Sequence, residues 1–163
     1  MGIDLTSAWS FWYHAHDAQD WSRESYKKIH TVKTAEEFWG VFQLMTSSHI
    51  SKGMFFVMKE NIFPDWKSPE NRRGGFWSIK LDAHKKKIDV LNVLKEWLAS
   101  MISNCIVDIN SLVTIHGLSL SPKNGHFIIK LWVRDTEATS RVKLTQTLPH
   151  VSGNKFTPFS YKI

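Results

Sequence analysis

A chain of 163 residues can bury about 70% of the surface that its unfolded form exposes, so a single domain spanning residues 1–163 is expected. No apolar run approaches the ~18 residues of a membrane span, no signal peptide is recognisable, and one cysteine cannot build a disulfide framework, which together predict a soluble cytoplasmic protein. The net charge of +6 is compatible with an anionic partner, and eight tryptophans supply surfaces on which bases can stack.

The first expected elements are two strands. Apolar and polar residues alternate over residues 8–14, with Trp9, Phe11 and Tyr13 on one face, which is typical of a half-buried strand. A second strand is expected over residues 26–32, after a polar loop.

A helix is expected next. Thr34 and Glu37 have the spacing of a capping box, in which each side chain binds the other residue's backbone amide, so the helix begins there and is predicted to run to about residue 48. Trp39 lies beside its apolar stripe. A third strand is expected over residues 54–59.

The middle of the chain predicts a long loop, a strand and a second helix. Residues 60–74 are polar and contain two prolines and the isolated Trp66. A strand is expected over residues 76–81 and a helix over residues 89–104. The helical spacing of its apolar residues places Cys105 on the buried face.

The last third of the chain predicts a hairpin, a weak helix and a closing strand. Residues 112–120 and 126–134 alternate well and are joined by turn residues, so they are expected to pair antiparallel. A short helix is expected over residues 136–147. A strand over residues 156–162 is expected at a sheet edge, because Pro158 cannot donate to a central ladder.

Strands interleaved with two or three helices predict an α+β domain. One antiparallel sheet would carry the helices on one face.

Trp21 and Trp66 stand in polar loops outside the periodic segments. An exposed indole is costly unless it covers a neighbour or binds a ligand. From the residues alone, the two tryptophans could recognise a ligand or fold back onto the domain surface.

Short aromatic motifs follow one another along the chain: Trp9-Ser10-Phe11-Trp12-Tyr13, Asp20-Trp21-Ser22, Glu37-Phe38-Trp39, Ile62-Phe63-Pro64-Asp65-Trp66, Asn71-Arg72-Arg73-Gly74-Gly75-Phe76-Trp77 and Ile129-Lys130-Leu131-Trp132. Their order and spacing resemble the translation initiation factor 4E family over residues 5 to 163. The resemblance implies a curved antiparallel sheet, backed by two or three helices on its convex face, with a cap-binding cleft on the concave face.

The resemblance also implies a function: binding the 7-methylguanosine cap of mRNA and recruiting capped mRNA for translation initiation. Trp21 and Trp66 would stack on the two faces of the base, which methylation at N7 leaves positively charged. Trp132 matches the family tryptophan near the N7-methyl group.

A second surface is implied on the opposite side. Trp39 resembles the tryptophan that receives a short helical motif from the 4G scaffold subunit or from inhibitory 4E-binding proteins, and Leu94, Glu96 and Leu98 match the neighbouring part of that surface. Lys95 stands where the family usually has an apolar residue. The protein is expected to act as a monomer.

The base-edge position departs from the family pattern. Lys67 replaces a glutamate that accepts hydrogen bonds from guanine N1 and N2, and a lysine has no acceptor. Glu70 and Asp65 are the candidates to replace it, with Glu70 narrowly preferred.

The phosphate end also departs, because Phe76 replaces an arginine. Lys130, which shares a strand face with Trp132, is the first candidate for phosphate binding, followed by Lys123 and His126 in or beside the hairpin turn.

Two other functions stay open. The chain could be a protein-interaction module of the same fold that has lost ordinary cap recognition and regulates translation through its dorsal helix surface. An enzyme acting on cap nucleotides is the third possibility, but no catalytic, metal-binding or nucleotide-hydrolysis motif supports it, and no cofactor is expected.

Overall fold

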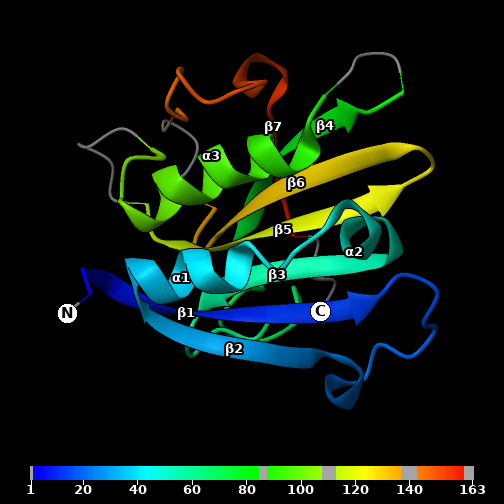
Figure 1. Ribbon diagram of the computed structural model, residues 1–163, viewed down its shortest axis with the longest axis horizontal. Helices are drawn as coiled ribbons and strands as arrows, with labels where there is room; N and C mark the ends of the chain where they lie inside the picture. The colour runs from blue at the N-terminus through cyan, green and yellow to red at the C-terminus, as the bar shows by residue number, and fades with distance from the viewer. Residues whose placement is uncertain (1, 85–87, 108–112, 137–142, 160–163) are drawn as a thin grey trace.

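The computed structural model describes residues 2–84, 88–107, 113–136 and 143–159. Within them, one antiparallel sheet of seven strands has the order β2-β1-β3-β5-β6-β4-β7. The strands are β1 (Asp4–Ala15), β2 (Lys27–Thr34), β3 (Gly53–Lys59), β4 (Gly75–Asp82), β5 (Ile115–Lys123), β6 (His126–Val133) and β7 (Lys155–Pro158). Figure 1 shows the helices on one face of this sheet, so the expected α+β architecture is confirmed.

The helices are α1 (Ala35–Phe42), α2 (Ser47–Lys52) and α3 (Val90–Ile102). The capping box at the start of α1 forms as expected, since the Glu37 amide donates to the Thr34 hydroxyl at 3.2 Å. The single helix expected to run to residue 48 is wrong. Thr46 begins a second capping box with His49, which stops one helix and starts another.

The sheet face beneath the helices carries the main core. Side chains on neighbouring strands form continuous apolar rows across this face, and the row at its centre contains Phe11, Val57, Leu118, Leu131 and Trp77. All five are 4% exposed or less. Each such side chain contributes about 1.5–3 kcal/mol on burial, so this face provides much of the stability.

The opposite face alternates with the core and has a different composition. The adjacent row across the sheet contains Trp12, Phe56, Ser119, Lys130 and Ser78. A small separate apolar cluster on this side is formed by Phe56, Met58 and Trp132. Successive side chains of a strand point to opposite faces, so these residues lie on the face away from the core. This face offers polar and aromatic groups together.

The hairpin of β5 and β6 and the edge position of β7 are confirmed, although residues 160–162 of the expected last strand lie outside the described residues. Of the weak helix expected over residues 136–147, residues 137–142 also lie outside them, and residues 143–147 are not helical. The expected burial of Cys105 is wrong, since the thiol is exposed. Helix α3 ends at Ile102, and Asn104 with φ of 59° turns the chain before the cysteine.

Candidate functional site

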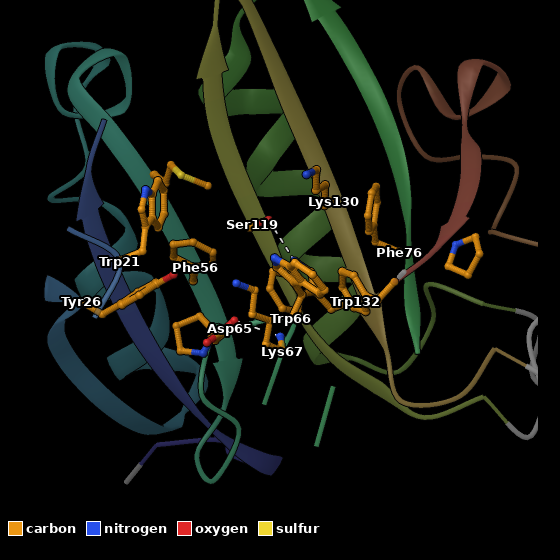
Figure 2. A pocket seen from close by; sticks show the side chains of 14 residues that line it. Trp21, Tyr26, Phe56, Asp65, Trp66, Lys67, Phe76, Ser119, Lys130 and Trp132 are labelled. Carbon is orange, nitrogen blue, oxygen red and sulfur yellow. Dashed lines mark hydrogen bonds between the residues drawn. The ribbon is translucent and has the colours of Figure 1, made fainter. Parts of the chain in front are cut away.

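A pocket of about 570 Å³ opens on the sheet face that carries no helices. Its floor comes from the central strands, and its walls come from the loop that follows β1 and the loop between β3 and β4. Seven of its 14 lining residues are aromatic: Trp21, Tyr26, Phe56, Trp66, Phe76, Trp132 and Phe159. Figure 2 shows several of these rings around one space, so the pocket is suited to a flat ligand.

Trp21 and Trp66 both line this pocket and both keep much of their surface exposed, 52% and 38% respectively. One face of Trp21 is covered by the buried His14, whose ring lies parallel to the indole with centroids 4.0 Å apart and an interplanar angle of 4°. Trp66 lies near Phe159, with centroids 6.3 Å apart and planes 22° apart. Neither indole is folded into the main core, so each has surface to offer a ligand.

Trp132 lies on the pocket floor and is 5% exposed. Its indole nitrogen donates to the Ser119 hydroxyl at 3.0 Å, which satisfies the only polar atom of the side chain. Phe56 and Phe159 flank the ring, with centroids 6.1 and 5.2 Å away. The floor therefore presents an apolar surface held in one orientation.

Of the two acids expected near the base edge, Asp65 lines the pocket and Glu70 does not. The Glu70 carboxylate instead binds within its own loop, where a backbone N–H and the Ser68 hydroxyl lower its pKa. The narrow preference for Glu70 therefore gives way to Asp65.

The pocket also contains Tyr26. Burial, together with the nearby Asp65 carboxylate, raises the pKa of Tyr26 to about 12.

Lys67 also lines the pocket. Its ammonium group lies 5.3 Å from the centroid of the Trp66 ring, within cation–π distance. A positive charge thus already rests against one of the two exposed indoles.

At the other end of the pocket, Lys130 is half-buried and its ammonium group lies 4.5 Å from the Phe76 ring. Burial lowers the pKa of Lys130, with a further contribution from the charge of Lys123. Lys123 and His126 pair at the tip of the hairpin and do not line the pocket. His126 lies beside Asp82, with Nδ1 3.8 Å from Oδ1.

The helix face carries the second predicted surface. Trp39 is half-buried, and the Lys95 ammonium lies 5.9 Å from its ring centroid. Glu96 is exposed, but Leu94 and Leu98 are 2% and 0% exposed. Their expected place on an open partner surface is wrong: they pack into the core beneath α3 and support the surface from below.

Phe159, Tyr26 and Phe56 line the pocket but were not among the expected site residues. The alternation of β3 contains the signal for Phe56, which faces away from the buried Val57. Phe159 reaches the pocket because β7 pairs with β4, a contact between distant parts of the chain that has no local sequence signal.

Comparison with known proteins decides the family. The family model described as eukaryotic initiation factor 4E matches residues 4–162. The chain belongs to the eukaryotic initiation factor 4E family.

Relatives within the family are distant in sequence. The chain is 28% identical to eukaryotic translation initiation factor 4E of Aplysia californica over 152 residues, which cover 88% of this chain and 69% of that protein. It is also 28% identical to the factor of Saccharomyces cerevisiae, with 92% of this chain and 78% of that protein covered. The match to the type 1B factor of Mus musculus spans 54% of that longer protein, at 24% identity over 82% of this chain.

Solved structures share the 4E fold. Ascaris suum eIF4E-3 in complex with the m7G cap superposes with a TM-score of 0.73 at 24% identity, over 83% of this chain and 76% of that chain. A schistosome eIF4E in complex with m7GpppG and 4E-BP gives a TM-score of 0.72 at 24% identity, over 83% and 74% of the two chains.

None of the helices in the described parts of the chain is long and apolar enough to cross a membrane.

Proposed function

We propose that this member of the 4E family binds the 7-methylguanosine cap of mRNA, with the base held between Trp21 and Trp66, and recruits capped mRNA for translation initiation. The observation that carries the proposal is that two exposed indoles from separate loops line one pocket. Ascaris suum eIF4E-3, which shares the fold, was solved in complex with the m7G cap, and this supports the choice of ligand. We place this activity in the cytoplasm, within a single domain, and assign it no catalytic step.

The chemistry of the ligand fits the aromatic walls. Methylation at N7 gives the guanine ring a positive charge, which the faces of indole rings attract. Each stacked base contributes about 1–3 kcal/mol per aromatic ring, and the cation–π attraction adds about 0.5–2 kcal/mol. Unmethylated guanine would keep the stacking and lose the charge.

Trp132 provides the contact for the methyl group. Its ring is fixed by Ser119 and presents apolar surface at the pocket floor. A methyl group placed against that surface would leave water, which stabilises the methylated ligand further.

Asp65 is the acceptor we propose for the guanine edge. One of its carboxylate oxygens accepts the Lys67 backbone N–H at 2.9 Å, and the remaining lone pairs can accept from guanine N1 and N2. The Lys67 ammonium would have to leave the face of Trp66 or share it with the cationic base.

Lys130 is the first group we propose for the phosphates, because it is the candidate that lines the pocket. Lys123 and His126 lie four residues farther along the hairpin, about 13 Å along the strand direction, where they could meet a more distant part of the RNA. Phe76 offers the phosphates no charge, so this end of the pocket binds them more weakly than an arginine would.

The helix face is proposed to bind a short helical motif of a 4G-type scaffold or of a 4E-binding protein. A related factor of C. elegans was solved with the 4E-binding protein Mextli, and the schistosome factor with 4E-BP. Trp39 and Glu96 are the accessible groups of this surface, and Lys95 must move aside for a partner to reach the indole.

Calorimetric titration of the monomeric protein with 7-methylguanosine diphosphate tests the proposal. Binding is expected, and Trp21→Ala should weaken it at least about fivefold, because a stacked ring is worth about 1–3 kcal/mol. Leu44→Ala is the matched control, since Leu44 is an apolar side chain that is 67% exposed and does not line the pocket. Binding that is equal in the wild type and in Trp21→Ala would refute the proposal, and so would no binding at all.

A further inference from the structure

The same local arrangement occurs at both pocket tryptophans. Each follows an aspartate, in the sequences Asp20-Trp21-Ser22 and Asp65-Trp66-Lys67. The Asp20 carboxylate accepts the Ser22 backbone N–H at 2.8 Å, and the Asp65 carboxylate accepts the Lys67 backbone N–H at 2.9 Å. In both cases the aspartate closes a turn across the tryptophan, because its side chain binds the amide two residues on.

The first turn is anchored to the interior of the protein. The backbone carbonyl of Asp20 lies 2.8 Å from Nε2 of His14, a side chain with no exposed surface. The same nitrogen lies 3.1 Å from the Ser25 hydroxyl, which itself donates to the Ser22 carbonyl at 2.6 Å. His14 therefore contacts the first residue of the turn directly, reaches the last residue through the Ser25 hydroxyl and covers the tryptophan between them with its ring face.

The second turn is anchored in an equivalent way by another buried side chain. The amide of Asn71 donates to the backbone carbonyl of Asp65 at 2.9 Å and to that of Phe63 at 2.8 Å. The Asn71 carbonyl oxygen in turn accepts from Nδ1 of His116 at 2.8 Å. Asn71 has no exposed surface and His116 is 4% exposed, so the second anchor is as deeply placed as the first.

Buried polar groups are concentrated at these anchors. The buried polar or charged residues in the described part of the chain are Ser10, His14, Asn71, His116 and Ser119. His14 and Asn71 bind the two turns, His116 binds Asn71, and Ser119 binds the indole of Trp132. Burying a polar group costs free energy unless the group is hydrogen-bonded. The side chains in these contacts are therefore held in the orientation that keeps their hydrogen bonds.

We propose that Asp20 and Asp65 are positioning residues for the two stacking tryptophans, each fixing its indole through a turn whose backbone carbonyl is tied to a buried side chain. The expected effect of these aspartates on cap binding rests on the proposed function. Its geometric content, that each aspartate sets the orientation of the next residue, stands without a ligand.

The hydrogen bonds of the turn stabilise the ionised carboxylate of Asp20. The Ser22 backbone N–H is the largest cause that lowers the pKa of Asp20, followed by the Ser22 side chain. An asparagine keeps an oxygen that can accept the same N–H, whereas an alanine has none. Asp20→Asn should therefore preserve the turn that Asp20→Ala breaks.

The test uses fluorotryptophan-labelled protein and fluorine NMR, in which each of the eight tryptophans gives its own resonance. Trp21→Phe and Trp66→Phe assign the two pocket resonances. We expect Asp20→Ala to shift or broaden the Trp21 resonance alone, Asp20→Asn to return it to the wild-type position, and Asp65→Ala to act in the same way on Trp66 alone. Asp17→Ala, which removes an exposed acid from the same loop, should move neither.

Cap affinity is the second readout. Asp20→Ala should weaken binding of 7-methylguanosine diphosphate about fivefold to tenfold, the size expected for one lost hydrogen bond, and Asp20→Asn should restore it. Asp65→Asn separates two roles, because it keeps the turn and removes the charge. An unmoved Trp66 resonance with weakened binding would assign the Asp65 charge to the ligand and the turn to positioning.

A Trp21 resonance that is unchanged in Asp20→Ala would overturn the proposal. So would equal shifts of all eight resonances, or a failure of Asp20→Asn to rescue. Because Asp20 is exposed, the variants should fold. If the wild type binds no cap analogue, the NMR result still decides the positioning claim, and only the proposed function fails.

Discussion

The two faces of the sheet differ in role: the face beneath the helices provides the stable core, and the opposite face carries the candidate binding pocket. On the helix face, rows such as Val57, Leu118 and Leu131 are continuous, apolar and almost fully buried. On the pocket face, aromatic rings alternate with a hydroxyl and an ammonium group, and two indoles remain exposed. Since adjacent residues of one strand serve opposite faces, neighbouring substitutions should separate folding from binding.

The largest expected effect is on the helix face. Leu131→Ala should lower the free energy of unfolding by about 2–5 kcal/mol, because it leaves a cavity at a position with no exposed surface. Denaturant unfolding measures this loss. Cap affinity at temperatures where the variant is folded should stay within a factor of about two. An equally large loss of unfolding free energy in Lys130→Ala, the neighbouring position on the opposite face, would contradict this difference between the faces.

The second effect is on the pocket face. Trp66→Ala should weaken binding of 7-methylguanosine diphosphate by about 2–4 kcal/mol, from lost stacking and lost cation–π attraction. Because this indole is 38% exposed, the free energy of unfolding should change by less than about 1 kcal/mol. Titration and unfolding of the same preparation provide the check. A variant that unfolds easily and binds normally when folded would reverse the assignment of Trp66.

A third prediction sharpens the chemistry of the pocket face. Lys67→Glu removes a cation from beside Trp66 and adds an acceptor at the guanine edge. Affinity for the methylated ligand should rise by about 1–2 kcal/mol, because a carboxylate replaces an ammonium group beside the cationic base and joins the Asp65 carboxylate as a second acceptor at the guanine edge. Lys67→Gln is the control that removes the cation without adding a carboxylate. Equal affinities in the glutamate and glutamine variants would argue against a base-edge role for position 67.

The smallest effect is a pH dependence of stability at His116. Burial, together with the charges of Lys59 and Arg134, lowers the pKa of His116 from 6.5 to about 4. Between these values the unfolded ring takes up a proton that the folded ring does not, so stability falls as pH falls from about 6.5 to about 4. Between about pH 6.5 and 5 the loss attributable to this side chain should be about 1–2 kcal/mol. His116→Gln, measured by denaturant unfolding across that range, should lack this component.

Much of the fold could be predicted because its signals are local. Alternation located the strands, and the Thr34 capping box located the start of α1. The break before α2 was missed, because Thr46 and His49 form an unusual capping box in which a histidine takes the place of glutamate or glutamine. Cys105 shows the same limit, since helical spacing carries no information about where the helix ends.

Site residues that stand out by their own type and local sequence could be predicted. Site residues that depend on contacts between distant parts of the chain could not. Trp21 and Trp66 stood out as tryptophans in polar loops, and both line the pocket. The choice between Asp65 and Glu70 depended on how the loop folds around a buried asparagine, which no local pattern reveals. Phe159 reaches the pocket through the pairing of β7 with β4, two strands that lie far apart in the sequence.

The most direct measurement is the affinity of the wild-type protein for 7-methylguanosine diphosphate beside that for guanosine diphosphate, under identical conditions. A pocket that holds a cationic base between indoles should favour the methylated ligand by at least about tenfold, since the charge and the methyl contact together exceed about 1.4 kcal/mol. Equal affinities for the two ligands would contradict the account.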